Sequence, residues 1–194
     1  MNKIIGRIIL GTGLLLSAAG ASAGWRQLNV PETIQEHSNW CWAGTSKAIL
    51  NYYGTSADQC RIVNWAFGIN YACGNRDFNW NSYANQPNSV YGTGGSVQNI
   101  LNSWGNLSNS AYSYASSWNS VVWDINNNRP FVIRYGWTNG GGHILVGDGW
   151  ESSNGTNYVY MMNPWPGEGQ TYSTYAYTVS SSDHRWTHTL RMNR

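Results

Sequence analysis

The sequence predicts an α+β domain of two lobes, in which helices come first and strands follow. As far as about residue 125, apolar residues recur at the three- and four-residue spacing of helices that bury one face. After Pro130 the chain carries short segments rich in aromatic and β-branched residues, separated by Gly, Asn and Ser, which is typical of strands in an antiparallel sheet. We therefore expect a helical N-terminal lobe, a β C-terminal lobe and a functional site in the cleft between them.

Four helices are expected in the first half of the chain. Ser38 or Asn39 can cap the first helix, and Gly54 can end it. A capping-box spacing at residues 56–59 precedes the second helix, which stops before Gly68. The third and fourth repeat apolar residues at positions i, i+3, i+4 and i+7. The four helices are expected at about residues 40–53, 62–67, 97–104 and 118–125.

The strands are expected after Pro130, where the period of the pattern changes. No internal repeat or long linker interrupts the chain, so one domain is expected over residues 24–194. The strands are expected at residues 131–137, 143–146, 158–162 and 175–179.

Residues 1–23 have the features of a signal peptide. Lys3 and Arg7 precede an apolar run at residues 8–16, and the small residues Ala21, Ser22 and Ala23 follow it. The apolar run is too short to cross a membrane as a helix. We expect cleavage after Ala23, a secreted or periplasmic protein, and no stable membrane association.

The charge of the mature chain argues against several classes of partner. Loss of Lys3 and Arg7 leaves nine basic and nine acidic residues, so no basic surface for nucleic acid or anionic membranes is expected. A metal site is not expected either, because no two histidines share ligand-like helical spacing and the cysteines do not form a CxxC motif. We expect a monomer without a cofactor.

Three cysteines are an odd number for an exported chain. Cys60 and Cys73 can form a disulfide across a short loop, which would stabilise the fold by about 3 kcal/mol. The alternative is that these two thiols stay free or mispaired. With the bridge formed, Cys41 is left as the unpaired thiol.

Cys41 is a candidate nucleophile because it stands at the expected start of the first helix. Unpaired N–H groups and the helix dipole stabilise a thiolate there and lower its pKa. Six residues upstream, Gln35 can offer its side-chain amide to a developing oxyanion, together with the backbone N–H of Cys41. The alternatives are a buried structural cysteine and a solvated loop glutamine.

His143 is the candidate base among the four histidines. It follows three glycines, which allow close approach of the backbone, and it begins an apolar strand. His37 is too close in sequence to Cys41 to reach it from the opposite wall of a cleft. His184 and His188 have no special neighbours in the sequence. The alternative for His143 is a strand histidine that is bonded to the backbone.

Asn163 is the candidate residue that orients the base. It ends the strand after that of His143, so the two side chains can lie side by side and fix the imidazole tautomer. Trp165 can cover their hydrogen bond and exclude water. Asp148 is a rival for this role, but the strand carries it away from the imidazole. Asn163 before a proline is also a common turn opener.

These residues carry a resemblance to a known family. The run from Gln35 to Ala43, the pair Gly142-His143 and the run from Asn163 to Trp165 resemble the papain-like cysteine peptidases. The resemblance is greatest to compact secreted bacterial members such as staphopains and the effector proteases of plant pathogens. It implies a two-lobed fold and hydrolysis of proteins or peptides through a thioester.

The resemblance also implies the role of each site residue. Cys41 would be the nucleophile, His143 the general base, Asn163 the orienting group and Gln35 the oxyanion donor. The chain departs from the eukaryotic pattern, because Asn39-Trp40 stands where a disulfide cysteine precedes the nucleophile. The short segment before Gln35 also leads us to expect no inhibitory pro-segment.

Two alternatives stay open at this point. The same site could cleave another amide or a thioester, for example in peptidoglycan or in a ubiquitin-like conjugate. The chain could instead be a secreted, Trp-rich binding or adhesion module with a relic site. The 12 Trp and 13 Tyr of a chain with almost no net charge are what supports that second alternative.

Overall fold

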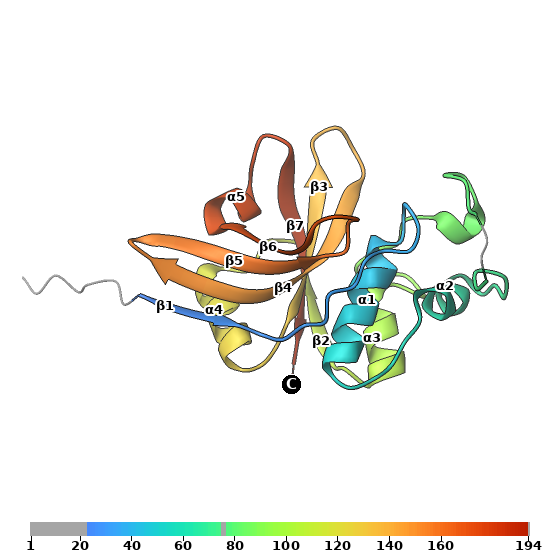
Figure 1. The fold of residues 1–194 in the computed structure, drawn as a ribbon, viewed down its shortest axis with the longest axis horizontal. Helices are drawn as coiled ribbons and strands as arrows, with labels where there is room; N and C mark the ends of the chain where they lie inside the picture. The colour runs from blue at the N-terminus through green and yellow to red at the C-terminus, as the bar shows by residue number, and fades with distance from the viewer. Residues whose placement is uncertain (1–22, 75–76, 194) are drawn as a thin grey trace, which may run out of the picture.

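A computed structural model describes residues 23–74 and 77–193 of the 194-residue chain (Figure 1). Residues 1–22, which hold nearly all of the expected signal peptide, lie outside the described residues. The helices are α1 (Cys41–Tyr52), α2 (Gln59–Phe67), the 3-10 helix η1 (Tyr83–Asn85), α3 (Val97–Gly105), α4 (Trp118–Asn126) and α5 (Tyr175–Val179). The strands are β1 (Gly24–Gln27), β2 (Asn109–Tyr112), β3 (Phe131–Trp137), β4 (Gly142–Ser153), β5 (Thr156–Asn163), β6 (Gly169–Thr174) and β7 (His184–Met192).

The strands of the described chain form one antiparallel sheet. Its order is β2-β7-β3-β4-β5-β6, and β1 pairs with β4 off this path. In the β3–β4 hairpin, Tyr135 pairs with His143 and Gly136 with Gly142. In the next hairpin, Val146 of β4 pairs with Met162 of β5, one residue before Asn163. The expected α+β class is therefore confirmed. The pairing of β4 with β5 also brings the start of β4 close to the end of β5.

Helices α1, α2 and α3 lie to one side of the sheet, and α4 packs against it beside β1 and β4 (Figure 1). Helix α1 is almost wholly buried and contacts β4. Thr45 Oγ1 donates a hydrogen bond of 2.9 Å to the carbonyl of Ile144, which joins the two lobes at the residue after His143. A Cβ on Gly44 would lie 3.1 Å from Cβ of Pro164, so a glycine lets α1 approach the loop after β5 closely.

The expected cap of the first helix is wrong. Helix α1 begins at Cys41, its N-cap is Trp40, and no side chain caps it. Ser38 and Asn39 are bound to Asn85 instead: Asn85 Nδ2 donates to Ser38 Oγ at 2.8 Å, and Asn39 Nδ2 donates to the Asn85 carbonyl at 2.7 Å. Because these polar groups are occupied by η1, the first N–H groups of α1 are left for the site.

The second helix agrees with the expectation in its end and differs at its start. Gly68 ends α2 in the left-handed conformation, and the disulfide between Cys60 and Cys73 is present as expected. The expected capping box is wrong, because α2 begins at Gln59 after the N-cap Asp58. The Gln59 amide instead donates to the Ile34 carbonyl at 2.6 Å and accepts from the Glu36 N–H at 3.1 Å. It therefore holds the backbone on both sides of Gln35.

The strand expected at residues 175–179 is wrong, because this segment is helix α5. Thr174 caps it by accepting the N–H of Tyr177 at 3.2 Å, and the hydroxyl of Tyr175 donates to the Ser116 carbonyl at 2.8 Å. The preceding segment, β6, already pairs with β5 and forms the edge of the sheet. Tertiary contacts thus outweigh the strand preference of aromatic and β-branched residues. The other three expected strands and all four expected helices are present, and β1, β2, β6 and β7 were not expected.

Candidate active site

The thiol of Cys41 lies where α1 meets β4. Cys41 is the free cysteine of the described residues; the residue as a whole is partly exposed, but protein atoms surround its thiol. The backbone N–H groups of Ile144 and Trp42 lie near its sulfur and favour its thiolate form, which lowers the pKa of Cys41 in part. Because Ile144 directly follows His143, a residue of the helical lobe and a residue of the β lobe contribute to one site.

Burial sets the resting protonation state of the thiol. It raises the pKa of Cys41 to about 11, although the N–H groups and the nearby positive charge of Arg134 act in the opposite direction. The expectation that the helix N-terminus lowers the pKa of this thiol is therefore wrong in its net effect. Removal of the sulfur from water outweighs the helix dipole, and the free site holds a thiol.

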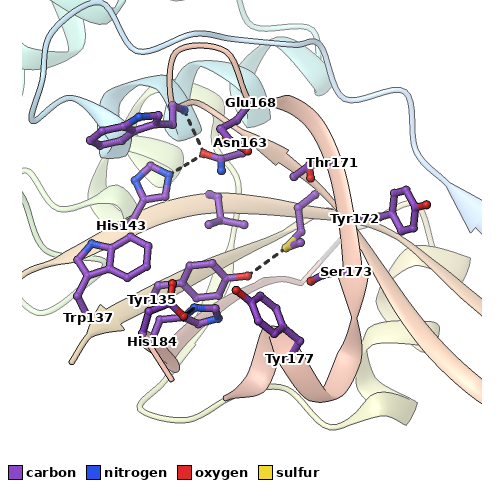
Figure 2. A pocket seen from close by; sticks show the side chains of 14 residues that line it. Tyr135, Trp137, His143, Asn163, Glu168, Thr171, Tyr172, Ser173, Tyr177 and His184 are labelled. Atoms are coloured by element: carbon purple, nitrogen blue, oxygen red, sulfur yellow. Dashed lines mark hydrogen bonds and ion pairs between the residues drawn. The ribbon is translucent and has the colours of Figure 1, made fainter. Parts of the chain in front are cut away.

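His143 is buried and hydrogen-bonded to Asn163. The two atoms, His143 Nε2 and Asn163 Oδ1, are 2.7 Å apart (Figure 2). Oδ1 also accepts the backbone N–H of Trp165 at 3.0 Å, and an N–H can only donate. The acceptor of both bonds must be the amide oxygen, so Nε2 of His143 carries the proton. Nδ1 is then the unprotonated nitrogen, available to take a proton from another group.

The environment keeps the imidazole neutral. Burial lowers the pKa of His143, and the hydrogen bond to Asn163 and the charge of Glu168 offset part of this effect. A neutral imidazole can accept a proton from another group.

Two indole rings surround the imidazole. The ring of Trp165 lies edge-on, with 5.6 Å between the ring centroids, and the ring of Trp137 lies nearly parallel at 6.2 Å. Trp165 was expected at this place and Trp137 was not. Trp137 ends β3, directly after Tyr135 and Gly136, which pair with the start of β4. Both strands were expected, so a hairpin between them would have placed Trp137 near His143.

Gln35 lies on the chain that leads into α1 and is buried. Its backbone N–H donates to the Pro164 carbonyl at 2.8 Å, next to Asn163. Its Nε2 donates to the carbonyls of His37 at 2.9 Å and Ser38 at 2.8 Å, and its Oε1 has no partner. The side chain is therefore fixed to the backbone just before α1, and donation to an oxyanion would replace one of these two bonds.

Arg134 is a second residue that the sequence did not identify. Its Nη1 donates to Thr187 Oγ1 at 2.8 Å and its Nη2 to the Gly141 carbonyl at 3.3 Å. A Cβ on Gly142 would lie 2.8 Å from Nη2, so the glycine before His143 leaves room for the guanidinium. The charge of Arg134 favours the thiolate of Cys41.

Asp148 makes no hydrogen bond to the imidazole. It is fully buried, its carboxylate oxygens have no hydrogen-bond partner, and the amides of Gln27 and Gln170 lie close to it. Burial raises the pKa of Asp148 to about 7. The partner of His143 in this structure is Asn163.

A pocket of about 530 Å³ opens beside His143 on the β lobe (Figure 2). Asn163 and Trp165 line it at the end nearest the imidazole, and His184 lines it as well. The other two histidines lie elsewhere: His37 packs against Trp40, and His188 lies beside Tyr91. His184 had no special neighbours in the sequence, and its place in this pocket comes from the fold alone.

Comparisons with known proteins agree on the type of fold. The model of the Peptidase_C39 like family matches residues 27–191. A protein from Bacillus anthracis, described provisionally as a C39-like peptidase, is 15% identical with a TM-score of 0.59, over 88% of this chain and 98% of that one. A structure from a study of the mite allergens Blo t 1 and Der p 1 is 11% identical with a TM-score of 0.55, over 92% of this chain and 73% of that one. No curated protein matches significantly.

Proposed function

The chain belongs to the Peptidase_C39 like family and is a cysteine peptidase of the papain-like superfamily, and from this premise we propose that Cys41 is its nucleophile, His143 its general base and Asn163 the residue that orients the base. One observation carries the assignment: the bond from His143 Nε2 to Asn163 Oδ1 leaves Nδ1 unprotonated, in the residue just before Ile144, whose backbone N–H lies near the sulfur of Cys41.

The reaction begins when Cys41 Sγ attacks the carbonyl carbon of a peptide bond. His143 Nδ1 takes the thiol proton at the same time, and the carbonyl electron pair moves to the oxygen. As the tetrahedral intermediate collapses, the C–N bond breaks and the imidazolium gives its proton to the departing amine. Water then attacks the thioester, loses a proton to His143, and releases the acid and the thiol.

The oxyanion needs donors on the side of the helical lobe. The backbone N–H of Cys41 belongs to the first turn of α1, where N–H groups have no partner within the helix. Gln35 supplies the second donor when its Nε2 gives up one of the two carbonyls that it now binds. The Gln59 amide binds the backbone of Ile34 and Glu36, and the Pro164 carbonyl binds the N–H of Gln35. These bonds hold the backbone of Gln35 in place during the exchange.

The protein acts on proteins or peptides, as a monomer, after export. We assign residues 1–23 to a signal peptide and residues 24–194 to the peptidase domain, and the start of β1 at Gly24 supports this division. The disulfide between Cys60 and Cys73 is consistent with an oxidising compartment outside the cytoplasm. No helix of the described residues is long and apolar enough to span a membrane.

The test is hydrolysis of an unfolded protein by the exported enzyme, with the released peptides identified by mass spectrometry. We expect cleavage by the native enzyme, a mass increase on Cys41 when the acyl-enzyme is trapped with acid, and loss of both in Cys41→Ala. Cys41→Ser is the matched control for size and folding. Full activity of Cys41→Ala would overturn the proposal. If the enzyme cleaves non-peptide amides and no peptide bonds, the proposed substrate class is wrong.

A further inference from the structure

The pocket beside His143 lies on the face of the sheet that carries the proposed base. Side chains of a strand alternate between faces, so Leu145 lies on the same face as His143, and Met161 on the same face as Asn163. Leu145 and Met161 line the pocket between the two ends. All of its lining residues come from β3 to β7, from α5 and from the loops between them. None comes from the helical lobe that carries Cys41 and Gln35.

This placement decides which part of a substrate reaches the pocket. In the proposed reaction, the carbonyl carbon lies at Cys41 and the oxyanion at the N–H groups of the helical lobe. His143 must protonate the departing amine, so that amine and the chain after it lie on the His143 side. The pocket therefore faces the residue that follows the scissile bond.

The walls of the pocket are aromatic and its charges are negative. Trp137 and Tyr177 line it (Figure 2), together with Trp165 near the imidazole. The charged side chains of the lining are the carboxylates of Glu168 and Asp183, and no Lys or Arg is among them. Aromatic faces and carboxylates both attract a cation.

A residue that lines the same pocket has a buried ring nitrogen without a partner. His184 is 3% exposed, and its ring stacks on that of Tyr135 with 3.9 Å between the centroids. Its Nδ1 lies 3.0 Å from Asp183 Oδ1 and 2.9 Å from Ser181 Oγ, and Ser181 donates its own proton to Asp183. A carboxylate only accepts, so Nδ1 carries the imidazole proton. In a neutral ring Nε2 is then the lone-pair acceptor, and it is buried with no partner.

We propose that this pocket binds the side chain of a lysine or arginine that directly follows the scissile bond. The assignment rests on the proposed function, because the position of the leaving group follows from the roles of Cys41 and His143. The cationic group lies between the aromatic walls and near Glu168 and Asp183, and its N–H donates to His184 Nε2 once the side chains that cover this nitrogen in the free protein shift. A buried acceptor is costly when it is unpaired, so a ligand that donates to it is favoured over an apolar one.

The test is competition between water and added amines for the acyl-enzyme. A substrate peptide forms the thioester with Cys41, and an amino acid amide that binds the leaving-group side captures the acyl group instead of water. The probes are argininamide, lysinamide, norleucinamide and the α-amide of glutamic acid. We expect capture by argininamide to exceed capture by norleucinamide about tenfold, from two partly exposed ion pairs of about threefold each. The guanidinium of argininamide is not a competing nucleophile.

Variants of the two carboxylates identify the source of the preference. Glu168→Gln and Asp183→Asn are each expected to reduce the ratio of argininamide to norleucinamide capture about threefold, and the double variant to bring it near one. Asp58→Asn is the matched control, because this exposed carboxylate is the N-cap of α2 in the helical lobe. Its ratio is expected to stay at the native value. Thermal unfolding of each variant identifies any loss of folding.

The outcomes separate the pocket from the catalytic assignment. Equal capture of all four amides, or a preference that survives in the double variant, overturns the assignment of the pocket while the thioester chemistry stands. A preference for the glutamic acid amide overturns it as well, since it would mean that the free nitrogen of His184 carries a proton. Absence of any thioester at Cys41 overturns the proposed function, and the pocket assignment with it.

Discussion

Two buried histidines on the same face of the sheet have different partners and different surroundings. His143 shares a hydrogen bond with the neutral amide of Asn163, and its other nitrogen, Nδ1, carries no proton. His184 contacts both Ser181 and Asp183 through the same nitrogen, Nδ1, and its Nε2 has no partner. In a nucleophile–base–orienter arrangement the two partners use different nitrogens. The second nitrogen of each ring therefore distinguishes their proposed roles. In the proposed reaction Nδ1 of His143 meets the Cys41 thiol, whereas in the proposed complex Nε2 of His184 meets the ligand.

The largest effect is expected from the proposed base itself. His143→Ala removes the acceptor of the thiol proton and should lower kcat by about a thousandfold or more for every substrate. His184→Phe keeps the stacking on Tyr135 and should lower kcat/KM by about three- to tenfold for substrates with a basic residue after the scissile bond. Steady-state kinetics on matched peptides measures both. Equal losses in the two variants would contradict the division of roles.

A smaller effect is expected from the orienting residue. Asn163→Ala should lower kcat by about 10- to 100-fold, because the imidazole loses the bond that fixes its tautomer. Asn163→Asp should also move the pH profile. Burial keeps the pKa of His143 below its ordinary value, so the acidic limb of kcat/KM should lie below pH 6.5 in the native enzyme. A carboxylate favours the imidazolium, so the limb should shift to higher pH in the variant, and an unchanged limb would exclude His143 as the titrating base.

The resting thiol can be tested by alkylation. Burial raises the pKa of Cys41 to about 11, so the thiolate fraction grows with pH through the neutral range. The rate of iodoacetamide reaction at Cys41 should rise about tenfold per pH unit between pH 6 and 9, as for a thiol below its pKa. A rate that reaches its plateau near pH 6 would instead indicate a thiolate–imidazolium pair. Cys41→Ser gives the background labelling.

The smallest effect concerns stability and a buried group without a charged partner. The pKa of Asp148 is raised from 3.8 to about 7 in the folded protein, so between about pH 4 and pH 7 the folded chain binds a proton that the unfolded chain does not. Stability should therefore fall as pH rises through this window, by at most about 1.4 kcal/mol per pH unit. Asp148→Asn should remove this slope and be more stable than the native protein at pH 7.5. Urea unfolding at pH 4.5 and pH 7.5 measures the free energy of unfolding of both proteins. A native protein that is more stable than the variant at pH 7.5 would contradict the expectation.

Local patterns identified most elements of the fold because helix and strand spacing depends on near neighbours. The stripes at residues 97–104 and 118–125 became α3 and α4 almost as expected. The failures occurred where a distant residue competed for a local partner. Asn85 binds Ser38 and Asn39, so they do not cap α1, and the pairing of β6 with β5 leaves residues 175–179 to form a helix. The disulfide between Cys60 and Cys73 could be predicted from the number and spacing of the cysteines, since it closes a short loop.

The sequence by itself determined the family resemblance, the order of the parts and the residue types of the proposed site, because these depend on motifs that run over a few residues. The tertiary structure decided the tautomer of His143, through the shared oxygen of Asn163, and the raised pKa of Cys41, through burial. It also decided that His184 lines a pocket with two carboxylates. Solvation and contact between distant segments are properties of the packed chain, and no short stretch of sequence carries them.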